Sequence, residues 1–184
     1  MMHSVQGFRL DRIPDNLLRE PLEFLVADHV RQRKLCSALE VITLGGEEDR
    51  AEEITDAIFA YLSEDFPLHI SDEEADLFPS LRTSSHHDDD VDDLIDALTR
   101  DHAMELSLAQ RVMVILQREM PRFEEPANTR NFAHLSATFT ECVRRHLAIE
   151  DRMLLPLARK RLSVADFDRM GRAMAARRNI DYPG

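Results

Sequence analysis

The stretch that decides the fold is His146-Leu-Ala-Ile-Glu150-Asp-Arg-Met-Leu-Leu-Pro156, which lies in a run of strongly helix-forming residues. On an α-helix, residues four apart are separated by about 400° of rotation and a rise of ~6 Å, so the His146 imidazole and the Glu150 carboxylate project from one face. This is a spacing suited to metal ligands. On an exposed face the same pair is commonly a surface interaction, so one copy is weak evidence.

A second copy occurs earlier, as His69-Ile-Ser-Asp-Glu73-Glu-Ala-Asp-Leu-Phe-Pro79. Both stretches have His, Glu, an acidic residue, Leu, a large apolar residue and Pro at matching offsets. The shared pattern after the glutamate makes coincidence a poor explanation. The two copies together therefore favour a metal site much more strongly than either does alone.

The composition indicates one all-α domain of 184 residues, because only five Gly, two Tyr and no Trp accompany abundant helix formers. A net charge of −12 argues against nucleic acid or an anionic membrane as the main partner. The chain has no apolar run of 18 residues, and its N-terminus lacks the layout of a signal peptide, so we expect a cytoplasmic protein.

The apolar periodicity predicts four long helices and one short helix. Four of the expected spans are about 17–44, 91–120, 128–161 and 164–177. The second helix is expected to begin near 47–49 and to carry its apolar stripe to 77, before a loop that starts at 83. Short connections between long helices favour an up-down-up-down four-helix bundle, here with a short C-terminal fifth helix. The corresponding division is an N-terminal arm at 1–16, the bundle at 17–161, and the C-terminal helix and tail at 162–184.

Several local signals accompany these helices. Asp15 or Asn16 is a candidate N-cap of the first helix, and Gly45-Gly46 should end it. Pro67 lies inside the second helix and should kink it just before the His69 motif. Ser163 is the expected N-cap of the fifth helix. For the loop His86-His87-Asp-Asp-Asp, a solvated acidic helix start is favoured over a site for a stray cation.

Two single histidines complete the pattern. His29 and His102 lie on the apolar faces of the first and third helices, and each precedes one of the His-xxx-Glu motifs. Each helical hairpin therefore supplies one His and one His-xxx-Glu, which makes two similar half-sites. His134 points about 120° away from His146 on its helix, so we expect it to be structural or exposed.

A metal centre explains this arrangement better than a polar core does. A single His on an apolar face is more often a hydrogen-bonded core residue, but four imidazoles and two carboxylates in one bundle would be costly to bury without a cation. The predicted metal ligands are therefore His29, His69, Glu73, His102, His146 and Glu150. Nitrogen and oxygen ligands without thiolate are compatible with iron, manganese or zinc.

The pattern resembles the hemerythrin-like (HHE cation-binding) family over about residues 17–160. This resemblance implies a four-helix bundle around two iron ions, a non-haem di-iron centre with an oxo or hydroxo bridge. It also implies that His29 and His69 bind one iron, that His102 and His146 bind the other, and that the two glutamates bridge them.

One position departs from the oxygen-carrying members, in which the third helix has two histidines four residues apart. Leu106 stands at the second of these positions. We expect Leu106 to face the centre, one turn beyond His102, so that an imidazole there would reach the same iron. Glu105 is an alternative ligand, although a surface position or an outer-shell role is favoured for it.

The resemblance leads to the expectation of a cytoplasmic di-iron protein that binds or reacts with O2, NO or peroxide, as a sensor, scavenger or store. Two alternatives stay open. One is a peroxidase-like or oxidase-like enzyme that uses open positions on the irons. The other is a regulatory module that metal binding merely stabilises and that acts through an unknown protein partner or as a homodimer.

The two cysteines, Cys36 and Cys142, are too few for a disulfide framework. Their offsets from His29 and His146 run toward the same end of an antiparallel bundle, so the two side chains could approach each other. Two separate buried thiols are nevertheless favoured, because a disulfide requires Cα atoms within about 7 Å.

Overall fold

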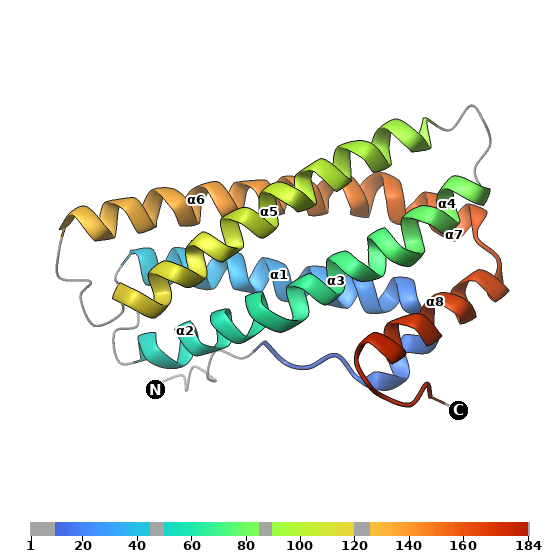
Figure 1. Ribbon diagram of the computed structural model, residues 1–184, viewed down its shortest axis with the longest axis horizontal. Helices are drawn as coiled ribbons and strands as arrows, with labels where there is room; N and C mark the ends of the chain where they lie inside the picture. Colours follow the sequence, from blue (N-terminus) through green and yellow to red (C-terminus); the bar gives the residue numbers. More distant parts are fainter. Residues whose placement is uncertain (1–9, 45–49, 85–89, 120–125, 184) are drawn as a thin grey trace, which may run out of the picture.

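The computed structural model describes residues 10–44, 50–84, 90–119 and 126–183, and every regular element in these ranges is a helix (Figure 1). The elements are a 3₁₀ turn η1 (Asp15–Arg19), α1 (Pro21–Thr43), α2 (Ala51–Ala60), a π turn η3 (Tyr61–Asp65), α3 (Phe66–Asp72), a π turn η4 (Glu73–Leu77), α4 (Phe78–Ser84), α5 (Val91–Glu119), α6 (Pro126–Ile149), a π turn η6 (Glu150–Leu154), α7 (Leu155–Arg161) and α8 (Val164–Arg177).

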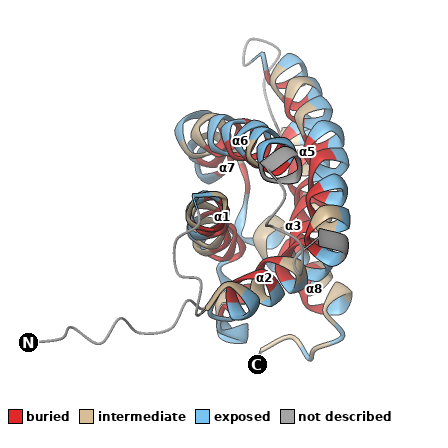
Figure 2. Cartoon of the chain, turned by 90° about the vertical axis from the view of Figure 1, so that its left-hand side faces the viewer, coloured by how far each residue is buried: buried red, intermediate tan, exposed pale blue. Residues whose placement is uncertain are grey.

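These elements form four long rods and one short helix. The rods are α1, the continuous run from α2 to α4, α5, and the run from α6 to α7, and they lie along the long axis of the molecule with their buried faces turned inward (Figures 1 and 2). The short helix α8 packs near one end against η1, α1 and α3. The expected all-α bundle with a fifth helix is thus confirmed. No helix in the described ranges is both long and apolar enough to span a membrane.

Each of the three π turns ends two residues before a proline. Phe66, Phe78 and Leu155 donate their backbone N–H groups to the carbonyl five residues earlier, and Pro67, Pro79 and Pro156 follow directly. A proline inside an α-helix lacks an N–H and its ring collides with the carbonyl four residues before it, whereas a wider turn removes that collision. The departure expected at Pro67 is therefore a π turn, and the same device recurs in both motifs.

Two expected helix starts are wrong by a few residues, and proline explains both. The first helix does not run unbroken from residue 17. Instead, η1 is followed by Glu20 in a non-helical conformation, and α1 begins at Pro21. A residue before proline avoids the helical region, and proline itself suits the first turn. The residue preceding η1 is Pro14, without a side-chain cap, so the expected cap at Asp15 or Asn16 is absent. Similarly, α6 begins at Pro126.

The remaining local expectations have mixed outcomes. Ser163 caps α8 as expected, because its hydroxyl accepts from the Asp166 backbone N–H and the Asp166 carboxylate accepts from the Ser163 backbone N–H. His134 is exposed, as expected. Gly45-Gly46 and the loop with His86 and His87 lie outside the described residues.

The interior consists of two apolar clusters with a polar layer between them. One cluster includes Leu35, Phe66 and Leu147 toward the C-terminal end of α1, and the other includes Leu25, Leu77 and Leu154 toward its N-terminal end. Along every rod, the predicted ligands fall between residues of the first cluster and residues of the second. The fold therefore brings all six to one level of the bundle, with apolar packing on both sides.

Helix α8 is anchored to the rod that contains the first motif. Asp72, which is fully buried, accepts hydrogen bonds from Arg177 (2.8 Å) and from Arg178 (2.6 and 3.1 Å) at the C-terminal end of α8. At the other contact, the backbone of Gly171 approaches so closely that an added Cβ would lie 2.1 Å from the Leu18 carbonyl oxygen of η1. Charge pairing and this close approach fix α8 against the bundle.

Candidate metal centre

The six predicted ligands meet in the buried polar layer. His29 comes from α1, His69 from α3, His102 from α5 and His146 from α6, while Glu73 and Glu150 are the first residues of η4 and η6. All six side chains are at most 2% exposed. The sequence thus predicted which residues come together, from four separate rods.

The ligand atoms form two overlapping groups. His29, His69, Glu73 and Glu150 make one group, and Glu73, His102, His146 and Glu150 make the other, with all ligand atoms of a group within 4.8 Å of one another. Both glutamates belong to both groups. Each group has the nitrogen and oxygen donors that suit a divalent or trivalent transition-metal ion.

The distances show how Glu73 reaches both groups. Its Oε1 lies 3.5 Å from His69 Nε2 and 3.9 Å from His29 Nε2, and its Oε2 lies 3.2 Å from His102 Nε2.

Glu150 does the same from the opposite rod. Its Oε2 lies 3.4 Å from His29 Nε2 and its Oε1 lies 3.2 Å from His146 Nε2. The two carboxylates therefore join the histidine pairs as bridging ligands would.

Most of the inward-facing donor atoms of this layer have no hydrogen-bond partner in the protein, whereas His102 Nε2 and His146 Nε2 lie 3.1 Å from each other. Both oxygens of each glutamate and the Nε2 atoms of His29 and His69 are buried and unpartnered. Buried polar groups without partners are costly, and a cation in each group would satisfy them together. The residues therefore fit the metal ions that the sequence pattern implies.

The outward-facing nitrogen of each histidine lies toward a carboxylate on a neighbouring rod. His29 Nδ1 is 2.8 Å from Asp151, His69 Nδ1 is 3.2 Å from Asp28 and His102 Nδ1 is 2.8 Å from Glu74. His146 Nδ1 is 3.8 Å from Glu105, which is too long for a hydrogen bond.

These contacts run once around the bundle, because each rod supports the histidine of the next. A carboxylate at Nδ1 favours the tautomer with the proton there, which leaves the Nε2 lone pair directed inward.

The charges of the layer balance one another through shifted pKa values. Burial alone would lower the pKa of a histidine, but the hydrogen bond to Asp151 and the nearby glutamates raise the pKa of His29 to about 9. The same competition raises the pKa of His69 to about 10 and that of His146 to about 9. Burial would raise the pKa of Glu73, but the surrounding histidines hold it well below its ordinary value. Protons and metal ions thus compete for the same nitrogens.

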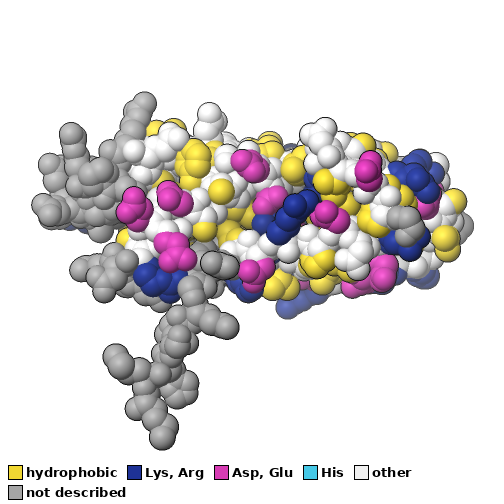
Figure 3. Space-filling model, turned by 90° about the horizontal axis from the view of Figure 1, so that it is seen from below, with side chains coloured by type: hydrophobic (Ala, Val, Ile, Leu, Met, Phe, Trp, Pro, Cys, Tyr) yellow, Lys and Arg dark blue, Asp and Glu magenta, His cyan; other side chains and the backbone are white. Residues whose placement is uncertain are grey.

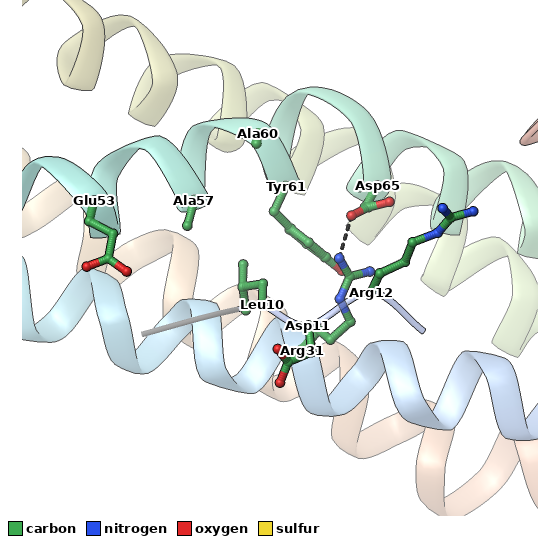
Figure 4. A pocket seen from close by; sticks show the side chains of 9 residues that line it. All are labelled: Leu10, Asp11, Arg12, Arg31, Glu53, Ala57, Ala60, Tyr61 and Asp65. Atoms are coloured by element: carbon green, nitrogen blue, oxygen red, sulfur yellow. Dashed lines mark hydrogen bonds and ion pairs between the residues drawn. The ribbon is translucent and has the colours of Figure 1, made fainter. Parts of the chain in front are cut away.

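The support of His69 extends to a surface groove. Tyr61 is buried and donates its hydroxyl to the same Asp28 oxygen that faces His69, at 2.8 Å, and Arg31 donates to the other Asp28 oxygen at 2.7 Å. Figure 4 shows Tyr61 and Arg31 in this groove, with Arg31 also bonded to Asp65. A fixed orientation of the Asp28 carboxylate follows from these contacts.

The expectation for Leu106 is wrong. Its side chain is 38% exposed, whereas Glu105, one residue earlier, is 1% exposed and faces His146. Relative to His102, position 105 is rotated by about −60° and position 106 by about +40°, and here the inward face of α5 lies on the 105 side. Burial raises the pKa of Glu105 to about 7. The outer-shell position favoured for Glu105 thus agrees with the geometry.

Three outer-shell carboxylates were not predicted from the sequence, although a signal was present. Asp28 precedes His29, Glu74 follows Glu73 and Asp151 follows Glu150, so each is a chain neighbour of a predicted ligand. A neighbouring residue is turned by about 100°, so it points toward the next rod instead of into the centre. The adjacency was visible in the sequence, but the histidine that each carboxylate supports was not.

The two thiols are separate, as favoured from the sequence, and both are buried. Cys142 Sγ lies 3.9 Å from Met104 Sδ and from an Arg145 nitrogen.

The family model described as the hemerythrin HHE cation binding domain matches residues 20–158. The chain belongs to this family. Searches of curated proteins and of solved structures give no match. The hemerythrin HHE match includes all six predicted ligands and stops before α8, so the anchored C-terminal helix lies outside the part that the family model describes.

Proposed function

We propose that this hemerythrin-like protein binds two iron ions, with His29 and His69 on one ion, His102 and His146 on the other, and Glu73 and Glu150 bridging them. The observation that supports the proposal best is that the two buried ligand groups share both glutamates. Such overlap is what a shared pair of ions requires, and two independent single-ion sites would not need it.

When bound, such an iron pair supplies two adjacent redox-active ions to which O2, NO or peroxide can bind. The residues of this chain do the rest. The Nδ1 contacts orient the imidazoles, and the apolar clusters pack against the layer on both sides. We propose a role in binding or reacting with such small molecules, as sensor, scavenger or store.

The proposal includes a cytoplasmic location and no nucleic-acid partner. Acidic and basic side chains alternate with apolar ones on the described part of the face in Figure 3, and that face has no continuous basic surface. The net charge of −12 also opposes binding to a phosphate backbone.

Elemental analysis after iron-replete expression tests the proposal directly. We expect about two iron ions per chain, matching the two ligand groups, and an absorption band in the near ultraviolet from a bridged ferric pair. Parallel loading with manganese and zinc identifies the preferred metal, since the donor set accepts all three. Fewer than one metal ion per chain would refute the di-iron centre.

A further inference from the structure

Among the buried polar atoms without a hydrogen-bond partner in the protein, four lie together outside the metal centre, in one region of the bundle. They are Gln32 Nε2, Glu105 Oε1, Ser136 Oγ and Thr140 Oγ1, and their residues are at most 4% exposed. All belong to α1, α5 and α6, on the side of the centre where the cluster with Cys36 packs. We call these four residues and Cys36 the polar seam.

The polar seam lies between a surface groove and the centre. Ser136 and Thr140 line a groove of about 600 Å³ between α1 and α6, beside the exposed ion pair of Glu40 and Arg144. Inward of the groove, the Thr140 hydroxyl lies beside the Cys36 thiol, whose pKa burial raises to about 11 and on which the Glu105 carboxylate also acts. Glu105 then faces His146 Nδ1.

Helix geometry gives the length of this route. Thr140 lies six residues before His146, and Ser136 lies ten residues before it. These intervals correspond to roughly 9 and 15 Å along α6. On α1, Gln32 lies one turn and Cys36 two turns beyond His29. The seam therefore provides a polar group at nearly every turn between the groove and the ligands.

The second groove along α6 has a different lining. It lies against α5 and includes Ser107, His134 and Leu135, and none of its described lining residues has a buried polar atom without a partner. Polar groups placed at this density in an otherwise apolar core suit molecules that form hydrogen bonds, and they offer nothing to an apolar gas.

We propose that the polar seam is the entry route to the centre for small, neutral, hydrogen-bonding molecules, namely water and hydrogen peroxide. The inference rests on the proposed function, because it identifies peroxide, in preference to O2, as the reactant that the route fits. A route alters only the barrier to entry. A change in the seam should therefore alter association and dissociation of a ligand by the same factor and leave its Kd unchanged.

The test uses stopped-flow spectra of the iron-loaded protein mixed with azide, whose small, neutral conjugate acid, hydrazoic acid, forms hydrogen bonds and is the species expected to enter. Thr140→Leu fills the seam and should slow both rate constants about tenfold, equivalent to roughly 1.4 kcal/mol of added barrier. Thr140→Ala opens it and should accelerate both. Ser107→Leu makes a comparable enlargement in the second groove and should change neither. The melting temperature and iron content of each variant show whether fold and centre are intact.

Unchanged rates in both Thr140 variants would overturn the route, as would a changed Kd with unchanged association, which would place the effect at the centre itself. A preparation without iron would instead refute the proposed function. In that case the seam is tested by a crystal structure that shows ordered water. Water molecules bonded to Ser136, Thr140 and Gln32 support it, and a dry seam refutes it.

Discussion

Two adjacent glutamates provide a matched test of the centre. Glu73→Gln and Glu74→Gln make the same chemical change at neighbouring positions, and glutamine nearly preserves the volume of the side chain. Glu73 lies within 3.2 to 3.9 Å of Nε2 atoms on three histidines, and both of its oxygens are directed inward. Glu74 is 39% exposed and lies with its Oε1 2.8 Å from His102 Nδ1, on the outer side of that ring.

The expected magnitudes follow from these contacts. An outer-shell change typically weakens metal binding 10- to 100-fold, or about 1.4 to 2.7 kcal/mol, and glutamine at position 74 can still accept from Nδ1, so we expect about tenfold for Glu74→Gln. Glu73→Gln removes a charged ligand from both ions at once. We expect each ion to be bound more than ~100-fold more weakly, so that the purified variant retains less than one iron per chain.

The assay measures iron per chain after exchange into a buffer with a chelator of fixed affinity, together with the rate of iron loss. Circular dichroism and a thermal melt of both variants without metal establish that the helices persist. Retention of about two iron ions by Glu73→Gln, at the rate of the unmodified protein, would show that Glu73 is not a bridging ligand. Equal iron loss from both variants would show that metal binding does not depend on whether the side chain faces the centre or the outside.

Three further outcomes are expected. Leu106→His should leave the absorption spectrum and the kinetics of reaction with oxygen unchanged, because position 106 is exposed. A new absorption band or a stabilised oxygen adduct would show that position 106 faces the centre. Loading at pH 7 should release about three protons, because three histidines of the centre have pKa values of about 9 to 10. Titration calorimetry in buffers of different ionisation enthalpy counts these protons. The metal-free protein should also lose stability as the pH rises from 6.5 through 10, because histidines with raised pKa values stabilise the folded state only while they are protonated. Arg178→Ala should cost about 2 kcal/mol in urea denaturation, because it removes two hydrogen bonds from the buried Asp72 carboxylate; Arg172→Ala, whose partner Asp168 is exposed, is the control and should change little.

The convergence of the six predicted ligands was predictable because helix periodicity and the repeated motif constrain it twice. His69 and Glu73 must share a face at four residues, and so must His146 and Glu150, whatever the details of packing. The single histidines were identified by their place on apolar stripes. The family match over residues 20–158 agrees with this interpretation.

The rotation of α5 about its own axis, which decides which of its residues face inward, was not predictable in the same way. Both Glu105 and Leu106 are within 60° of His102 on a helical wheel, and a rule that favours apolar residues inside selects Leu106. The structure selects Glu105, because the imidazole of His146 lies on that side. A buried acid next to a ligand is a feature of the site, and local hydrophobicity opposes it.

The helix boundaries depended on prolines whose effect the periodicity does not contain. Pro21 moves the start of α1, because the residue before a proline avoids helical geometry. The expected interruption at Pro67 was found, but its form, a π turn, depends on which carbonyl remains available inside the folded bundle.

The π turns also limit how the chain can change length. On a regular α-helix, Leu81 would be rotated by about 120° from His69, twelve residues earlier, yet both are buried. The extra residue that η4 accommodates reduces this rotation to about 20°, and η6 does the same between His146 and Ala158. Deletion of a single residue such as Ala75 would close the wide turn and return Pro79 to a collision with the backbone, whereas insertion of one residue would rotate everything that follows by about 100°. The interval from each glutamate to its proline is therefore a fixed length, in which substitutions are tolerated more readily than insertions or deletions.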